Sequence, residues 1–323
     1  MDYVLVTGCA GFIGSHLAKA LLLRGYSVVG VDCLTPYYSQ KIKQHNLSSL
    51  LKNDKFIFVK LDLSAASIDN LAQLVRKVNV IIHEAAQPGV RSSWGGDFEI
   101  YVRHNVLATQ KLLEAIVKAR SVKRFVYVSS SSVYGDVKEV PIKEDVYSKP
   151  YSPYGVTKLA AENLCRAYFE NFGIPVVILR YFTVYGPRQR PDMAFHRFIK
   201  SMLRSEPIHI YGDGSQMRDF TYIDDVVNAT IRAIEADDVV NEVINVGSGS
   251  PVKLIDTVNL IADILGIEPK IVFEEEKKGD VRITYADISK ARRLLGWKPR
   301  TRLKDGLEEE AKWIREAMEL GLI

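Results

Sequence analysis

The chain has 323 residues, of which 47% are hydrophobic and 25% are charged, and its formal net charge is +4. This length supports a large buried core, in one large domain or in two coupled domains, and the composition is that of an ordinary globular protein. The small net charge argues against a nucleic-acid surface, and no apolar run reaches membrane-spanning length, so we expect neither partner.

Three cysteines, Cys9, Cys33 and Cys165, are odd in number and lack the spacing of a metal site. We therefore expect reduced thiols and no bound metal. Met1 leads directly into the apolar run 3–7, which leaves no room for a signal peptide. These features predict a cytoplasmic protein.

Short β-branched runs alternate with longer segments of helical period through the first part of the chain. Predicted strands cover residues 3–7, 27–32, 55–62, 78–85, 124–132 and 175–182, and predicted helices cover residues 12–24, 67–77, 105–119 and 153–173. This alternation predicts a parallel sheet with helices on both faces. The strands are apolar throughout, as expected for strands that are buried on both sides.

After residue 181 the pattern loosens into loops rich in Pro, Gly and Arg, with one short strand near 208–212. Residues 222–236 and 242–248 look like a helix and a strand that return to the main sheet. We expect a sheet domain made of residues 1–180 plus 222–246. Residues 181–221 plus 247–323 would form a smaller, discontinuous α/β domain over the carboxyl ends of the strands, where open α/β sheets bind ligands.

Three glycines, Gly8, Gly11 and Gly14, lie between the first predicted strand and the first predicted helix. Glycines here allow backbone N–H groups and the helix N-terminus to approach a pyrophosphate, although a packing turn also needs glycine. Asp32 ends the second strand, where a carboxylate accepts hydrogen bonds from adenosine ribose and repels a 2′-phosphate. The pattern predicts a Rossmann-type, doubly wound sheet that binds NAD in preference to NADP.

Tyr154 and Lys158 are four residues apart at the start of a predicted helix, and therefore share one face. A free tyrosine has a pKa near about 10 and is a poor base at neutral pH. A nearby lysine cation, together with an oxidised nicotinamide, favours the phenolate. The pair, with "SSSSVYG" (129–135) at a strand end, indicates proton transfer coupled to redox chemistry.

The G-x-x-G-x-x-G spacing and the Tyr-x-x-x-Lys pair resemble the extended short-chain dehydrogenase/reductase superfamily, and the whole chain resembles its nucleotide-sugar epimerase branch. The resemblance implies that Tyr154, aided by Ser130 and Lys158, takes the proton from the sugar 4-OH while hydride moves from C4 to NAD. The 4-keto sugar then turns over and hydride returns to its other face. The same resemblance places along the cofactor Phe12, Ile13, Asp62, Leu63, Ala85, Ala86, Gln87 and Tyr181, besides Tyr154, Lys158 and the glycines.

Departures from sister families narrow the choice of sugar. Dehydratases and decarboxylases of the superfamily usually carry an acid just before "VYG", where this chain has Ser131 and Ser132, so epimerisation without loss of a group is expected. Galactose 4-epimerases usually have Asn at the position of Thr183. The stretches at 180–194 and 279–287 resemble UDP-glucuronate 4-epimerases instead.

In that pattern Thr183, Arg190, Ser131 and Ser132 surround the C5 substituent of the sugar. Charge-assisted hydrogen bonds to Arg are strong, so these groups suit a carboxylate. The 4-keto intermediate would be a β-keto acid, and holding its carboxylate near the ketone plane suppresses loss of CO₂. The alternative is that Arg190 meets only the diphosphate or a surface acid.

Other substrate contacts follow from the same resemblance. Arg218 would hold the diphosphate with help from Lys277 or Arg282, His209 and Tyr211 would lie by the uracil, Asp280 by the uridine ribose, and Arg91 nearby. Three polar residues have structural interpretations instead: His83 as a strand-end residue, Arg180 as the partner of a buried acid, and Asn105 as a helix cap or a residue that orients the site.

The sequence therefore predicts an NAD-dependent UDP-glucuronate 4-epimerase. The alternative within the enzyme class is a UDP-glucose/UDP-galactose 4-epimerase. A nucleotide-sensing protein without catalysis is the alternative from another class, but the complete Ser130, Tyr154 and Lys158 set argues against it. By resemblance, helices near 104–120 and 153–172 would pair between two subunits in a homodimer.

Overall fold

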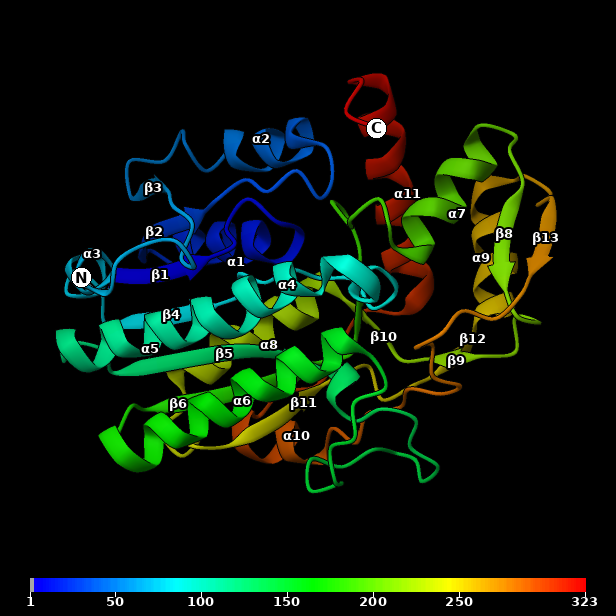
Figure 1. Cartoon of the computed structure of the whole chain (residues 1–323). Coiled ribbons are helices and arrows are strands. Elements are labelled where there is room, and N and C mark those ends of the chain that lie inside the picture. Colours follow the sequence, from blue (N-terminus) through cyan, green and yellow to red (C-terminus); the bar gives the residue numbers. More distant parts are fainter. Residues whose placement is uncertain (1–2) are drawn as a thin grey trace.

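The computed structural model describes residues 3–323, and a seven-stranded sheet forms its centre (Figure 1). The strands lie in the order β11–β6–β5–β4–β1–β2–β3, and all neighbouring pairs are parallel. Their bounds are β1 (Tyr3–Thr7), β2 (Ser27–Asp32), β3 (Phe56–Lys60), β4 (Val80–His83), β5 (Arg124–Ser130), β6 (Val176–Tyr181) and β11 (Val243–Val246). The order of the first six strands is that of a doubly wound, Rossmann-type sheet, so the predicted fold class is confirmed.

Helices cover both faces of this sheet because its strands are apolar on both sides; every residue of β2 and β6 is buried. One face packs against α1 (Phe12–Leu23), α2 (Gln40–Ser48), α8 (Ile223–Glu235) and α10 (Ser289–Leu295). The other face packs against α3 (Ile68–Val75), α5 (Ala108–Ala119) and α6 (Pro153–Phe172). Two large apolar cores result, one on each side.

Local signals in the sequence set the bounds of α6 closely. Ser152 caps its start, because its side-chain oxygen accepts a hydrogen bond from the Gly155 N–H at 3.2 Å, and Pro153 occupies the first helical position. Gly173 ends the helix in the left-handed conformation, with φ of 69°. The first turn of α6 therefore lies at a fixed place beside the end of β5.

The helix predicted at 105–119 begins earlier than its sequence pattern suggests. It follows two short 3₁₀ turns, η1 (Arg91–Ser93) and η2 (Gly95–Asp97), and starts as α4 (Phe98–Tyr101). It continues through a π-helical turn, η3 (Val102–Leu107), into α5. Such π turns often occur at functional sites, and this one directs Asn105 towards the loop after β4.

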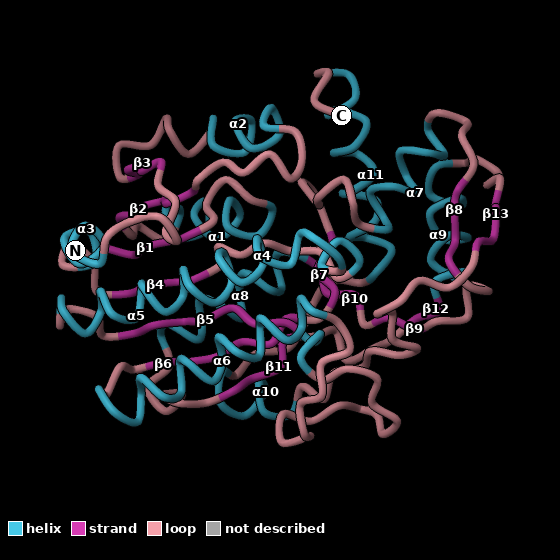
Figure 2. The backbone as a smooth tube through the Cα atoms, in the orientation of Figure 1, coloured by secondary structure: helices cyan, strands magenta, loops and turns pink. Residues whose placement is uncertain are grey.

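A smaller α/β region lies beyond the carboxyl ends of the sheet strands, at the right of Figures 1 and 2. Its helices are α7 (Ala194–Leu203), α9 (Leu254–Leu265) and α11 (Leu303–Glu319). Its paired strands are β8 (Ile208–Tyr211) with β13 (Ile271–Glu274), β9 (Met217–Arg218) with β12 (Val252–Lys253), and β7 (Thr183–Tyr185) with β10 (Phe220–Tyr222). These elements enclose a third core of their own.

The α10 region belongs to the packing of the main sheet, although its residues come late in the chain. Ala286, Ile288, Leu295 and Trp297 lie in the same core as α1 and α8. The division into domains of residues 1–180 plus 222–246 and 181–221 plus 247–323 remains our proposal, although α10, from the second domain, packs against the main sheet. Within residues 3–323, no helix is both long and apolar enough to span a membrane.

Candidate active site

The carboxyl ends of the sheet strands and the smaller region enclose a cavity of about 760 Å³. Strand ends supply one wall, since β1, β2, β4, β5 and β6 all finish at this edge. Loops from the first part of the chain and the segment around 190–197 supply the others. The cavity is large enough for sizeable ligands, as such pockets usually span about 300–1,000 Å³.

The glycine turn has the geometry that a pyrophosphate requires. Gly8 has φ of +73°, and a Cβ at Gly14 would lie 2.2 Å from the Gly8 carbonyl oxygen. These two positions therefore need glycine. The turn leads into α1 at Phe12, so unpaired N–H groups of its first turn face the cavity wall formed by Gly11, Ile13 and Gly14.

Asp32 and Asp62 mark the far end of the cavity from the catalytic pair. The Asp32 carboxylate accepts hydrogen bonds from the Ala10 N–H at 3.1 Å and from the Leu34 N–H at 2.7 Å. Burial acts to raise the pKa of Asp62, but hydrogen bonds from Ser64 lower it on balance. Both acids line the cavity together with Leu63, at positions suited to an adenosine ribose and adenine.

Tyr154 and Lys158 reach the cavity from the first turns of α6, as their spacing predicts. Lys158 donates a hydrogen bond to the carbonyl oxygen of Val128 at 2.5 Å and lies 4.7 Å from the centre of the Tyr127 ring. Burial lowers the pKa of Lys158, although the carboxyl of Glu84 opposes this. The ammonium group is thus fixed against the end of β5.

The pKa of Tyr154 differs from the simplest expectation. Burial raises it to about 12, and the groups that act to lower it are the Arg190 cation and a hydrogen bond with Ser130. Burial therefore outweighs these two groups and leaves the pKa above its ordinary value. An oxidised nicotinamide beside the phenol would add a positive charge that favours the phenolate.

The serines of "SSSSVYG" follow β5 into a 3₁₀ turn, η4 (Ser131–Val133). The side chain of Ser130 accepts a hydrogen bond from the Ser132 N–H at 3.2 Å, and the two hydroxyls are 3.1 Å apart. Ser130, Ser131 and Ser132 all line the cavity, as does Thr183 from the start of β7. Small hydroxyls from β5 and β7 thus share one chamber with Tyr154.

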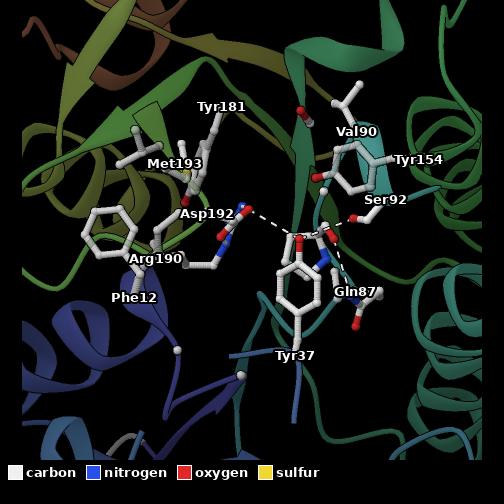
Figure 3. Close-up of a pocket in the computed structure, with 18 of the residues that line it drawn as sticks. Phe12, Tyr37, Gln87, Val90, Ser92, Tyr154, Tyr181, Arg190, Asp192 and Met193 are labelled. Carbon is white, nitrogen blue, oxygen red and sulfur yellow. Dashed lines mark hydrogen bonds and ion pairs between the residues drawn. The ribbon is translucent and has the colours of Figure 1, made fainter. Parts of the chain in front are cut away.

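Arg190 enters the same chamber from the loop between β7 and α7. Figure 3 shows it opposite Tyr154, beside Asp192 and Met193. Its Nε and Nη2 donate to the two oxygens of Asp192 at 3.0 Å and 3.1 Å. Arg190 therefore lines the cavity, and its hydrogen-bond partner in this structure is Asp192.

Four of the predicted contacts for the nucleotide half of the substrate line the cavity: Arg91, His209, Tyr211 and Asp280. Arg91 bonds Asp280 at 2.7 Å and lies 4.3 Å from the centre of the Tyr211 ring. Lys277 also lies over this ring at 5.0 Å. The aromatic ring, the cations and Asp280 form one cluster at this end of the cavity.

Arg218 and Lys277 do not line the cavity in this structure. Arg218 lies on the short strand β9, and its guanidinium donates to the Met217 carbonyl at 2.8 Å and to that of Arg282 at 3.4 Å. Backbone acceptors therefore bond one nitrogen, Nη1, of the guanidinium that the resemblance assigns to the diphosphate. Its role remains a prediction, as does that of Lys277.

The structural interpretations of His83 and Arg180 are confirmed, whereas Asn105 does not cap a helix, because it lies inside η3. His83 lies between Thr7 and Thr109 at 2.8 Å and 3.0 Å, and burial lowers its pKa to about 3. Arg180 pairs with the buried acid Glu162. Asn105 orients the loop after β4 by accepting from the Gln87 N–H at 2.7 Å, which places Ala85, Ala86 and Gln87 along the cavity.

Several lining residues were not singled out from the sequence, among them Tyr37, Glu84 and Asp192. Glu84 follows β4 directly, and its Oε2 is buried without a hydrogen-bond partner among the described residues. Burial raises its pKa, while Lys158 and Arg190 oppose the rise. A carboxyl inside "IIHEAAQ" was the available signal, because few acids follow a buried strand without a role.

No group of three or more His, Cys, Asp or Glu residues able to hold a metal occurs within residues 3–323. All three cysteines carry free thiols. The cavity brings together the glycine turn, the Ser130, Tyr154 and Lys158 set, and the side chains of Thr183 and Arg190. A sheet and site of this kind define a dinucleotide-dependent enzyme that moves a proton and a hydride on a hydroxyl-bearing substrate.

The chain belongs to the NAD dependent epimerase/dehydratase family, whose pattern it matches over residues 4–247. A Bacillus subtilis (strain 168) protein called an uncharacterized UDP-glucose epimerase, YtcB, is 47% identical over 96% of this chain and 97% of its own length. A UDP-glucuronate 4-epimerase of Thermodesulfobacterium geofontis is 39% identical over 99% and 98%.

Solved structures show the same similarity. The UDP-glucuronic acid 4-epimerase of Bacillus cereus, in complex with UDP-glucuronic acid and NAD, superposes with a TM-score of 0.94 at 46% identity, covering 97% of this chain and 99% of that one. MoeE5 was solved with UDP-glucuronic acid and NAD and also with UDP-glucose and NAD. It superposes with a TM-score of 0.87 at 42% identity, covering 98% of this chain and 100% of that one.

Proposed function

We propose that this chain interconverts UDP-glucuronate and UDP-galacturonate by NAD-dependent epimerisation at C4, without loss of CO₂. The observation that carries the proposal is that Tyr154 and Ser130 line the same cavity as Thr183, Arg190, Ser131 and Ser132. The first group suits proton transfer at a sugar hydroxyl, and the second suits a carboxylate on the neighbouring carbon. Both needs of a hexuronate epimerase are met within one cavity.

The residues present fit NAD. Gly8 and Gly14 form a turn that a Cβ would obstruct, and α1 begins directly behind it. Asp32 lines the cavity at the end of β2, where its carboxylate would bond the adenosine ribose and would repel a 2′-phosphate. When bound, NAD supplies the acceptor for hydride from C4 of the sugar and returns that hydride to the opposite face.

The chain's own residues would handle the proton and the orientation of the sugar. Tyr154 would take the proton from the 4-OH and later return it, with Ser130 sharing the hydrogen bond. Lys158, fixed on the Val128 carbonyl, would hold the cofactor ribose and support the phenolate electrostatically. The smaller α/β region, which lies over the carboxyl ends of the sheet strands, would exclude water from the ketone.

The hydroxyls and Arg190 would hold the C5 carboxylate near the plane of the 4-ketone. A β-keto acid loses CO₂ when its carboxylate bond stands perpendicular to that plane. Holding the group in the plane therefore keeps the reaction on the path to the epimer. The nucleotide would extend towards Tyr211, with Arg91 and Asp280 near the uridine and Arg218 near the diphosphate.

A neutral-sugar 4-epimerase is the second candidate. It is favoured by the name of the Bacillus subtilis relative and by the binding of UDP-glucose to MoeE5. Thr183 and Arg190 favour the hexuronate, because the guanidinium donors that Asp192 leaves free bond a carboxylate more strongly than a hydroxymethyl group.

We further propose a cytoplasmic homodimer. The free thiols agree with a reducing compartment. Several large apolar side chains are exposed along α4, the π-helical turn η3 and α6, and such residues together often mark an interface. They are Phe98, Ile100, Val102, Leu107 and Val156.

The test is conversion of UDP-glucuronate by the purified protein, followed by separation of the two epimers. We expect Tyr154→Phe to lower the turnover number by about 100- to 10,000-fold, because a positioned acid–base group contributes this much. The variant should keep its fold and its bound NAD. Unchanged turnover in Tyr154→Phe, or no conversion by the wild type, would contradict the proposal.

A further inference from the structure

The Arg190–Asp192 pair leaves part of the guanidinium unused. Asp192 takes the edge formed by Nε and Nη2, at 3.0 Å and 3.1 Å. Nη1 has no acceptor among the described residues, although the side chain is only 21% exposed. A planar guanidinium that is held along one edge has its other donors in a fixed direction. The charge of Arg190 acts on Tyr154, which places the guanidinium near the catalytic phenol.

Asp192 is itself held from its other side by residues far away in the sequence. Tyr37, from the segment after β2, donates to Oδ2 of Asp192 at 3.3 Å and lies 3.3 Å from the hydroxyl of Ser92. Ser92 in turn lies 2.7 Å from the hydroxyl of Tyr101. Figure 3 shows Tyr37 between Asp192 and Ser92. Tyr37 donates to the Asp192 carboxylate and can accept from the Ser92 hydroxyl, whereas Tyr101 donates to backbone carbonyl oxygens in the loop after β4.

The backbone that carries the pair is also anchored. Gln189, between Arg188 and Arg190, is buried, and its side chain donates to the Val184 carbonyl at 3.0 Å and accepts from the His196 N–H at 3.1 Å. Gly186 donates its N–H to Glu310 at 2.8 Å. The position of Asp192 therefore does not depend on Arg190 alone.

The opposite charges of Arg190 and Asp192 decide what the pair offers to an anionic ligand. Asp192 neutralises Arg190, so the pair attracts an anion less than a free guanidinium would. Burial acts to raise the pKa of Asp192, but Arg190 lowers it on balance, so the carboxylate stays ionised at neutral pH. The pair thus provides directed hydrogen-bond donors rather than net positive charge.

We propose that Asp192, held by Tyr37, is a positioning residue that aims the free edge of Arg190 at the C5 carboxylate of the sugar. It keeps this carboxylate near the plane of the 4-ketone, and so prevents decarboxylation. The inference rests on the proposed function. In the reaction prevented, the C5–C6 bond breaks and its electron pair forms an enolate with the 4-ketone. CO₂ leaves, and C5 takes a proton from solvent to give a 4-keto pentose.

The experiment compares the wild type, Asp192→Asn and Asp305→Asn, each purified with its NAD and supplied with UDP-glucuronate. Asp305 is a matched control, since it forms a similar two-bond pair with Arg302, at 2.8 Å and 2.7 Å, on the surface of α11. The readouts are kcat, KM, and the share of turnovers that release CO₂ and leave the bound dinucleotide reduced.

For Asp192→Asn we expect kcat to fall about tenfold or more, because small errors of placement are costly. We expect KM to stay level or fall, since Arg190 regains its net charge, and the CO₂ share to rise. Tyr37→Phe should change all three in the same direction but less, and it serves if Asp192→Asn does not fold. Asp305→Asn should match the wild type.

Unchanged kcat and CO₂ release in Asp192→Asn and Tyr37→Phe would overturn the inference, as would a raised KM with kcat intact. If the wild type does not convert UDP-glucuronate, the proposed function itself fails. A wild type that converts it beside variants that behave identically rejects only the role of Asp192.

Discussion

Two arginine–carboxylate pairs, whose arginines are ten residues apart in the sequence, show how burial decides what such a pair does. Arg180 on β6 bonds both oxygens of Glu162 on α6, at 2.9 Å and 2.7 Å, and the two side chains are 3% and 1% exposed. Arg190 bonds both oxygens of Asp192, but these side chains are 21% and 38% exposed and line the cavity.

The difference lies in what remains of each guanidinium. Arg180 also donates to the Glu144 carbonyl at 3.3 Å and lies 4.6 Å from the centre of the Tyr134 ring, so protein groups surround it. It fastens α6, which carries Tyr154 and Lys158, to the sheet. Arg190 keeps free donors towards the cavity. We conclude that the first pair maintains the fold and that the second is available to a ligand.

The strongest way to break this comparison is Glu162→Ala. Removal of one partner leaves the Arg180 charge buried and unpaired, and the free energy of unfolding should fall by about 3–5 kcal/mol. Urea unfolding, followed by circular dichroism, measures this. The control is Asp305→Asn, whose exposed pair should cost less than about 1 kcal/mol. Equal losses in the two variants would show that burial does not distinguish the pairs.

The loop that carries Arg190 leads to a second prediction, because two histidines, the half-buried His16 and the buried His196, bond its backbone. His16 bonds the Pro187 carbonyl and His196 bonds that of Gln189, both at 2.9 Å. Burial lowers the pKa of each to about 4, and burial lowers that of His83 to about 3. In the unfolded chain these pKa values lie near about 6.5, so acid favours protonation of the unfolded state.

The stability from these histidines is therefore complete above about pH 6.5 and is lost as the pH falls towards their folded pKa values. Each should lower the free energy of unfolding by up to about 1.4 kcal/mol per pH unit in this window. Urea unfolding at pH 7, 6 and 5 tests the slope, with His16→Gln expected to be shallower. A flat profile would show that the folded histidines take up protons as readily as the unfolded ones.

The smallest effect on folding is expected from a substitution on the exposed face of α6. Val156 is 49% exposed on the same helix as Glu162, and in a homodimer it would be covered by the other subunit. Val156→Glu should raise the dimer dissociation constant at least about tenfold and leave the monomer folded. Sedimentation measures this, and the control is Leu51→Glu, at an exposed position in the turn after α2. A wild type that is monomeric at all concentrations would reject the interface.

The sequence was sufficient for features that depend on neighbours along the chain. The turn at Gly8 to Gly14, the helix start at Ser152 and Pro153, and the shared face of Tyr154 and Lys158 all follow from local spacing. The alternation of strands and helices likewise predicted the doubly wound sheet. Each of these signals is contained within one turn, one strand or one helix.

Features that join distant segments were not predictable in the same way. The contact of Tyr37 with Asp192 spans 155 positions and depends on how the smaller region sits over the strand ends. The pairing of Arg190 with Asp192 needs the turn that closes between Arg190 and Met193, whose N–H bonds the Arg190 carbonyl at 3.1 Å. The pKa of Tyr154 depends on burial, which no spacing reveals.

The most direct test of the central claim is the specificity constant, kcat/KM, of the wild type and Arg190→Ala for UDP-glucuronate and for UDP-glucose. The account predicts that the wild type prefers UDP-glucuronate. It also predicts that Arg190→Ala loses about 10- to 100-fold with this substrate, the usual effect of a charged hydrogen bond, and changes little with UDP-glucose. A wild-type preference for UDP-glucose, undiminished in Arg190→Ala, would contradict it.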